Sequence, residues 1–275
     1  MITRKLIPLL VLLTIAYSAN AQKGFVKQSR LPRSLQKFEI GVSSVGAAGT
    51  YKSDFAYYDD EDKRWEGYHE SPTTSKGGLG VTLGTFYRIA LIGRRAAITA
   101  DINAAYNYLF WKGIGSGGFF YERTDNVGGV TKQLAVPVGL SLKFGNDGRL
   151  EKNHRFCTTF GAGVMPTFNT THLDDTLEVK KREKHRKWGA QPYVKFEAGI
   201  FAGLCFKLRL MYAFGDIQLT EDGESWNKEK FGVLHFNSRL KSTFTTTLVI
   251  MPFSYDWPDN GWWNSANTRV NWLPL

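Results

Sequence analysis

Apolar residues recur at every second position over most of this chain, and this period of two constrains the fold more than any other feature. Successive side chains of a strand point to opposite faces of its sheet, so an alternating segment gives the sheet one apolar face. Leu79, Val81 and Leu83 share one such face, whereas Gly80 and Thr82 share the other. Eight segments of this kind lie at residues 36–46, 78–92, 96–110, 130–144, 154–168, 188–200, 204–214 and 231–250. The sequence therefore predicts an all-β protein of eight strands.

The links between these segments alternate in length. Long links follow the odd-numbered strands, at residues 47–77, 111–129, 169–187 and 218–230, and shorter ones follow the even-numbered strands. Outer-membrane barrels show this alternation, with long loops outside the cell and short turns in the periplasm. We expect an eight-stranded antiparallel transmembrane up-and-down β-barrel over residues 36–253. A ten-stranded barrel and a water-soluble barrel or sandwich are the alternatives.

The start of the chain predicts export. Residues 1–22 combine Arg4 and Lys5, an apolar stretch at 6–16 and a small-x-small site at 19–21, which is typical of a secretory signal peptide. We expect this segment to be removed, so that the barrel lies in the outer membrane. Residues 23–35 would then form a periplasmic N-terminal segment, and residues 254–275 a tryptophan-rich periplasmic tail. The apolar fraction of 43% excludes a disordered chain, and 2 cysteines exclude a disulfide scaffold.

Charged residues gather on the face of the strands that is not apolar. In a membrane barrel this face lines the lumen, where charges must find partners or water. We expect a salt-bridged network that fills the lumen, and a narrow anion channel is the alternative because bases outnumber acids. The predicted network comprises Glu39, Arg88, Asp101, Lys143, Arg155, Lys195, Glu197, Lys207, Arg209, Arg239 and Lys241.

The chain resembles the small outer-membrane β-barrels of Gram-negative bacteria, of the OmpA/OmpX kind. More narrowly it resembles the PorT-type barrels of Bacteroidota, on segments 134–144 (LAVPVGLSLKF) and 159–168 (TFGAGVMPTF). The resemblance implies a non-enzymatic protein that acts through its loops or within an envelope assembly, such as the type IX secretion machinery. One departure is that such barrels end on an aromatic residue, whereas this chain continues for residues 254–275 after Phe253.

Two loops carry features that suggest binding. The first long link is acidic at residues 59–62 and contains Trp65, which favours a partner-binding loop. The third has the basic run 180–188 (KKREKHRKW), whose cations could bind lipopolysaccharide phosphates. The residues predicted for that contact are Lys180, Lys181, Arg182, Lys184, Arg186 and Lys187. Export argues against nucleic acid as a partner, despite a formal net charge of +10.

The histidines, cysteines and remaining acids give little indication of catalysis or metal binding. A surface hydrolase would need a histidine beside an acid, and His235 with Asp216 is the nearest approach to one. No spacing of His, Cys or Asp matches a metal site, and no cofactor is expected. Cys157 and Cys205 lie on strands that are not neighbours, which predicts free thiols. In the tail, Trp257, Trp262, Trp263 and Trp272 predict docking onto the periplasmic rim or a periplasmic protein.

Overall fold

The computed structural model describes residues 34–58, 64–93, 96–111, 129–151, 155–173, 184–220, 223–227 and 231–257. The predicted signal at 1–22, most of the segment 23–35 and the tail after Trp257 lie outside the described residues. The strands are β1 (Glu39–Tyr58), β2 (Arg64–Ile92), β3 (Ala96–Trp111), β4 (Gly129–Ala135), β5 (Val138–Gly145), β6 (Phe156–Leu173), β7 (Lys184–Phe201), β8 (Cys205–Gln218), β9 (Gly223–Asn227) and β10 (Phe231–Met251). The helical turns are η1 (Leu35–Lys37), α2 (Asn146–Arg149) and η2 (Ser254–Asp256).

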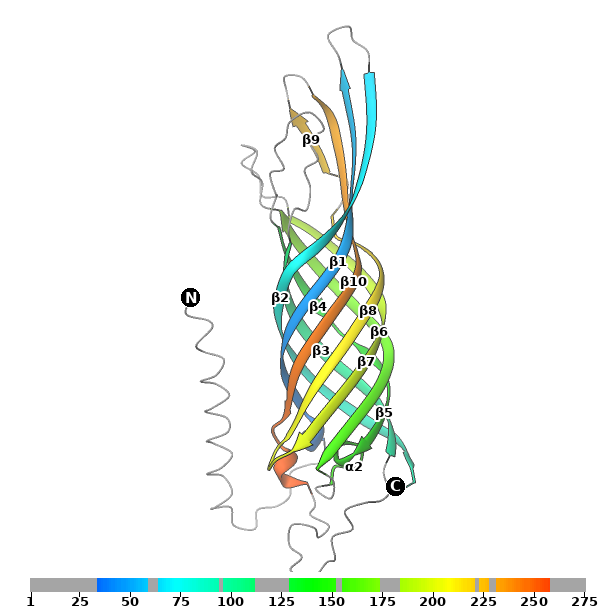
Figure 1. Ribbon diagram of the computed structural model, residues 1–275, viewed down its shortest axis with the longest axis vertical. Helices are drawn as coiled ribbons and strands as arrows, with labels where there is room; N and C mark the ends of the chain where they lie inside the picture. The colour runs from blue at the N-terminus through cyan, green and yellow to red at the C-terminus, as the bar shows by residue number, and fades with distance from the viewer. Residues whose placement is uncertain are drawn as a thin grey trace, which may run out of the picture.

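The strands close into a ring of eight, which confirms the predicted antiparallel barrel (Figure 1). Each strand pairs with its chain neighbour, and β1 pairs with β10 to close the ring. β4 and β5 form one strand of the ring, since both pair with β3 and β6. They are separated at Val136 and Pro137 because proline has no N–H to donate to the ladder. Backbone bonds from Val136 N to Pro166 O (2.9 Å) and from Asn103 N to Pro137 O (3.0 Å) bridge the interruption.

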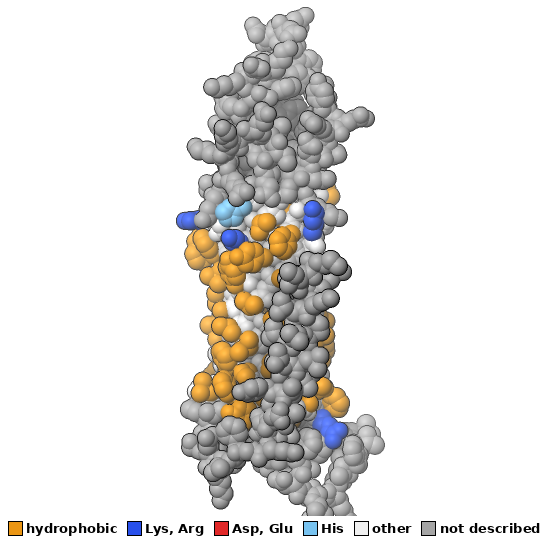
Figure 2. Space-filling view, turned by 90° about the vertical axis from the view of Figure 1, so that its left-hand side faces the viewer, with side chains coloured by type: hydrophobic (Ala, Val, Ile, Leu, Met, Phe, Trp, Pro, Cys, Tyr) orange, Lys and Arg blue, Asp and Glu red, His pale blue; other side chains and the backbone are white. Residues whose placement is uncertain are grey.

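The outer surface of the barrel is apolar, which is the reverse of a water-soluble barrel. Val42, Leu79 and Leu140 are 58%, 62% and 58% exposed, and hydrophobic side chains form a band around the wall (Figure 2). Such a band suits the hydrocarbon core of a bilayer. Polar side chains at the alternate positions point inward, as the period of two predicted.

Among the described residues, no helix has the length and apolar character needed to cross a membrane.

The two ends of the barrel differ (Figure 1). One end, called here the turn end, carries α2 and the segments that enter β1 and leave β10. At the opposite end, the loop end, β1, β2 and β10 continue beyond the ring, and β9 adds to β10.

The expectation of loops at 47–77 and 218–230 is therefore corrected. β1 and β2 stay paired to Tyr58 and Arg64, and β9 lies within the second of these links. The alternation of apolar residues stops where the strands leave the lipid, but backbone pairing does not need an apolar face and continues.

Candidate functional site: the closed lumen

Eight charged side chains form a layer across the lumen near the turn end. This ionic layer comprises Glu39, Asp101, Lys143, Asp147, Lys195, Glu197, Lys207 and Arg209. All are buried, and they come from β1, β3, β5, α2, β7 and β8. Strand alternation brings the seven strand residues together because each occupies an inward position at a similar height, and α2 adds Asp147.

Lys207 and Arg209 lie at the centre of the ionic layer. Lys207 Nζ lies 2.5 Å from Glu39 Oε1, 3.1 Å from Asp147 Oδ2 and 3.2 Å from Glu197 Oε2. Arg209 Nε donates to Glu197 Oε1 at 2.6 Å, and its Nη2 donates to Glu39 Oε2. Each of the two cations thus bridges carboxylates from different strands.

Lys195 and Lys143 complete the layer at its sides. Lys195 Nζ contacts Asp101 at 2.5 Å and Glu197 at 3.3 Å, and Asp101 also accepts bonds from Thr99 and Ser141. Lys143 Nζ lies 3.0 Å from Asp147 Oδ2 and 4.1 Å from the ring centroid of Phe86. Four acids and four bases make the layer formally neutral. The basic excess that supported an anion channel is therefore absent from this layer.

A metal ion does not fit the acidic part of this layer. The carboxylate oxygens of Glu39, Asp147 and Glu197 lie within 4.8 Å of one another, which is close enough for shared ligation. However, the Lys207 ammonium already contacts all three carboxylates. A metal would have to displace this ammonium and leave it buried without its partners, which is costly.

A layer of amides and hydroxyls lies on the loop-end side of the ionic layer. Asn107 Nδ2 donates to Gln133 Oε1 at 3.1 Å, and Gln133 Nε2 donates to Asn169 Oδ1 at 3.2 Å. Beyond them, Trp111 Nε1 donates to Thr131 Oγ1 at 2.9 Å. These bonds cross neighbouring strands and satisfy polar groups that are shut off from solvent.

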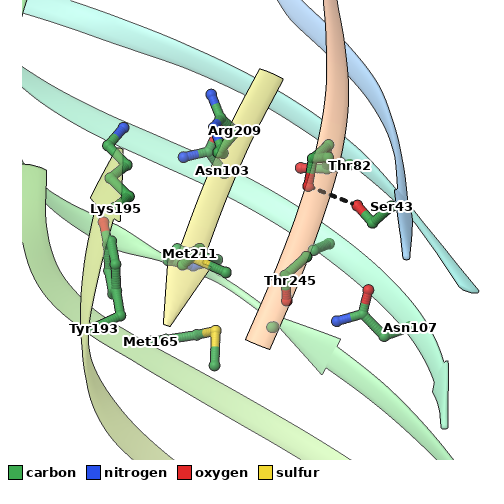
Figure 3. Close-up of a pocket in the computed structure, with 14 residues that line it drawn as sticks. Ser43, Thr82, Asn103, Asn107, Met165, Tyr193, Lys195, Arg209, Met211 and Thr245 are labelled. Atoms are coloured by element: carbon green, nitrogen blue, oxygen red, sulfur yellow. Dashed lines mark hydrogen bonds between the residues drawn. The ribbon is translucent and has the colours of Figure 1, made fainter. Parts of the chain in front are cut away.

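A small cavity separates the ionic layer from the amide layer (Figure 3). It measures about 20 Å³, which is the space of about one water molecule. Tyr193, Met165 and Met211 line it on one side, with Lys195 and Arg209 toward the ionic layer. It is too small to hold a substrate larger than a water molecule.

Apolar clusters fill both ends of the lumen. The turn-end cluster contains Phe86, Leu150, Cys157, Phe201, Cys205, Met251 and Trp257. The loop-end cluster contains Val45, Ala47, Leu109, Trp111, Ile217, Leu219 and Leu240. Both cysteines are free and buried in the turn-end cluster. The described part of the lumen is thus filled from one end to the other, as an eight-stranded interior allows.

Three of the residues predicted for the lumen network lie elsewhere, and a fourth, Arg88, lies outside the ionic layer. Arg155 is exposed at the turn end, whereas Arg88 is half-buried on β2, opposite the buried Thr99. Arg239 and Lys241 are 40% and 44% exposed, and both bind Asp216, at 2.9 and 2.7 Å.

A bulge explains the misplacement of Arg239 and Lys241. Gly49 of β1 lies opposite Leu240 and Ala48 lies opposite Ser242, so β10 has one extra residue here, and Leu240 and Thr243 both point inward. A bulge adds one residue to a strand and exchanges its faces. The alternation read from the sequence is therefore reversed on the loop-end side of this point.

Asp147 is the member of the ionic layer that the sequence reasoning missed. The alternating pattern places it in a short link between strands, yet α2 folds back under the barrel and buries its carboxylate completely. Its position four residues after Lys143 was a usable signal, since that spacing lets the two side chains meet.

The structure separates His235 from Asp216. Asp216 is engaged by Arg239 and Lys241, whereas in backbone register His235 lies opposite Asp54 and Glu224. From Lys241 to His235 the strand runs six residues, about 20 Å at the rise of a β-strand. The acid and histidine of the hydrolase hypothesis therefore do not meet.

The basic run 180–188 is divided between a loop and a strand. Lys180, Lys181 and Arg182 lie outside the described residues, and β7 begins at Lys184, whose side chain is also outside them. Arg186 is exposed on the outer face, whereas Lys187 is half-buried on the alternate face. Arg186 and Lys187 therefore cannot both face the lipopolysaccharide, because consecutive residues of a strand point in opposite directions.

These features define a class: a membrane-spanning antiparallel β-barrel of eight strands with a closed lumen. The solved structures similar to this chain are outer-membrane proteins. They include OprG from Pseudomonas aeruginosa (15% identity, TM-score 0.37, covering 76% of this chain and 94% of that one) and Neisserial surface protein A (9%, 0.29, 76% and 95%). Ail of Yersinia pestis is another (10%, 0.29, 76% and 98%). Neither a protein-family model nor a curated protein matches the sequence. At these identities no function is transferred.

A closed lumen predicts the absence of steady conductance. Reconstituted into planar bilayers, the purified protein is expected to leave the membrane resistance unchanged, because side chains block the described path at several heights. Single-channel recording over a range of voltages checks this. A stable unitary current that disappears in Lys207→Met would support the channel hypothesis instead. Heat-modifiable gel migration shows that this variant is folded.

Proposed function

We propose that this chain is a non-enzymatic outer-membrane protein that binds an extended polypeptide outside the cell. The part that acts is the outer sheet, defined as residues 50–58 of β1, 64–74 of β2, 231–238 of β10 and strand β9 (Figure 1). The single observation that carries the proposal is the continuation of these strands beyond a barrel whose lumen is filled.

The outer sheet has the strand order β2-β1-β10-β9, and no other strand among the described residues pairs with its two edges. The β2 register with β3 ends at Ser75 opposite Trp111, so residues 64–74 of β2 pair with β1 alone among the described residues. A strand edge of this kind presents N–H and C=O groups to an added strand. Pro72 interrupts this edge near the barrel, which protects it from pairing indiscriminately.

The sequence of the β1–β2 hairpin supports a protein partner. The sequence between its two strands is acidic at residues 59–62, and aromatic residues recur on both sides of that segment. Aromatic residues are enriched at protein interfaces, so their recurrence here supports a protein partner. The resemblance to PorT-type barrels is consistent with an envelope or secretion assembly as the setting.

The competing functions have less support. A channel lacks a path through the described lumen, and a hydrolase lacks the approach of Asp216 to His235. The tail after Trp257 lies outside the described residues, and its docking on the periplasmic side stays a prediction.

Shortening the hairpin tests the proposal. Gly49 lies opposite Thr73, so Asn-Gly in place of residues 50–72 would close the hairpin at the barrel rim. A photo-crosslinking amino acid at the exposed Thr74 should yield a defined protein adduct on intact cells, and the shortened variant should lose it.

Two controls show whether the adduct forms through the outer sheet. The same group at the exposed Arg155 reports contacts of the turn end, and removal of residues 258–275 leaves the outer sheet intact. An adduct that survives the shortened hairpin, or one formed at Arg155 alone, would contradict binding through the outer sheet.

A further inference from the structure

A row of outward-facing residues near the loop end joins two cations across a hydroxyl. In the register of the sheet, Lys132 on β4 lies opposite Thr170 on β6, and Thr170 lies opposite Arg186 on β7. Lys132 and Thr170 are half-buried and Arg186 is exposed. The inward neighbours Gln133 and Asn169 are fully buried, which fixes the outward direction of this row.

The spacing of the row suits one phosphoryl group. Neighbouring strands are about 4.8 Å apart, so the backbones of Lys132 and Arg186 are separated by roughly 10 Å, with Thr170 between them. Two long cationic side chains on either side of a hydroxyl can converge on a single tetrahedral anion. Arginine supplies paired donors for such an oxygen cluster, and lysine supplies a point charge.

Neither cation is ion-paired within the described part of the chain. Lys132 Nζ lies 5.6 Å from the ring centroid of Tyr108, its register neighbour on β3, and this contact holds the ammonium against the barrel wall. By contrast, Arg239 and Lys241, also outward and at the same end, share the Asp216 carboxylate. The row therefore differs from Arg239 and Lys241 because no described carboxylate offsets its charge.

An aromatic row lies directly on the membrane side of the cations. It comprises Tyr106, Leu134, Phe168 and Trp188, which are successive register partners across β3, β4, β6 and β7. The rings of Phe168 and Trp188 are 4.7 Å apart, and Trp188 is 76% exposed, more than any other large hydrophobic residue described. Tryptophan and tyrosine favour the depth of the lipid headgroups. Lys and Arg side chains mark the same edge of the apolar band (Figure 2).

From this arrangement we infer that Lys132, Thr170 and Arg186 bind a phosphate group of a lipid in the outer leaflet, with its acyl chains against the aromatic row. A membrane lipid fits better than a free anion, since half of the site is apolar and faces the bilayer. The site lies on the barrel wall and does not depend on the function proposed for the outer sheet.

The test compares phosphorylated lipid A with the same lipid after enzymatic removal of its phosphates. Native mass spectrometry of the detergent-purified full chain should show one retained phosphorylated lipid and no retention of the dephosphorylated form. Lys132→Gln and Arg186→Gln should each weaken retention about tenfold, as expected for loss of one charge-assisted contact. Heat-modifiable migration confirms that each variant is folded.

Lys76→Gln is the matched control, because Lys76 is an exposed cation on β2 near the same end but outside the row. Retention that falls equally in Lys76→Gln would show a diffuse basic surface and overturn the site. Equal retention of the dephosphorylated lipid, or complete displacement by millimolar inorganic phosphate, would also overturn it. No retention by the native chain has the same consequence.

Discussion

Replacement of Glu197 by glutamine is expected to lower the free energy of unfolding of the barrel by about 3–5 kcal/mol. Glu197 is fully buried and accepts contacts from Lys195, Lys207 and Arg209. An amide has the same shape but no charge, so the ionic layer would keep four cations with three anions. The excess charge remains shut off from water and destabilises the folded state.

Denaturant unfolding in phospholipid vesicles, followed by the gel shift of the folded barrel, measures this effect. Glu70→Gln is the matched control, since Glu70 pairs with Lys52 at 3.0 Å but both side chains are well exposed, at 40% and 37%. An exposed pair of this kind contributes at most about 1 kcal/mol.

A double variant separates charge from shape. Adding Arg209→Met to Glu197→Gln restores an equal number of acids and bases and should recover part of the lost stability. If Glu197→Gln and Glu70→Gln have the same free energy of unfolding, then water reaches the ionic layer and the lumen is not sealed.

Replacement of Trp257 by alanine is expected to have an effect of similar size, about 3–5 kcal/mol. Trp257 is 1% exposed and stacks on Phe201, with ring centroids 6.0 Å apart. Its Nε1 donates to Gln36 O at 3.2 Å, so the ring connects the exit of β10 to the entry of β1. Removal leaves a cavity in the turn-end cluster and abolishes this hydrogen bond.

The same vesicle unfolding assay applies, with Tyr255→Ala as the control. Tyr255 belongs to η2, two residues before Trp257, but is 49% exposed. Its replacement should change the free energy of unfolding by no more than about 0.5 kcal/mol. A Trp257→Ala variant as stable as Tyr255→Ala would show that the turn end closes without this ring.

Antiparallel pairing and the apolar outer face could both be read from the sequence. The apolar face follows from the period of two, which the backbone imposes on any strand, whereas the antiparallel direction follows from the alternation of long and short links. Seven members of the ionic layer, such as Lys195 and Glu197, lie on the inward faces that the same period predicts for charged residues.

The ends of the strands could not be predicted. The outer part of β2 carries no alternation because both of its faces lie outside the lipid, and only its pairing with β1 identifies it as a strand.

By itself, therefore, the sequence determined the number of strands, their direction and the face that each residue presents wherever the period of two holds. The tertiary structure alone decided where that period breaks, as at the bulge beside Leu240, and which distant charges meet. It brought Asp147 into the lumen beside Lys207 through a turn that the pattern does not describe. Alternation is a local property of extended backbone, whereas bulges and ion pairs depend on how neighbouring strands align when the barrel closes.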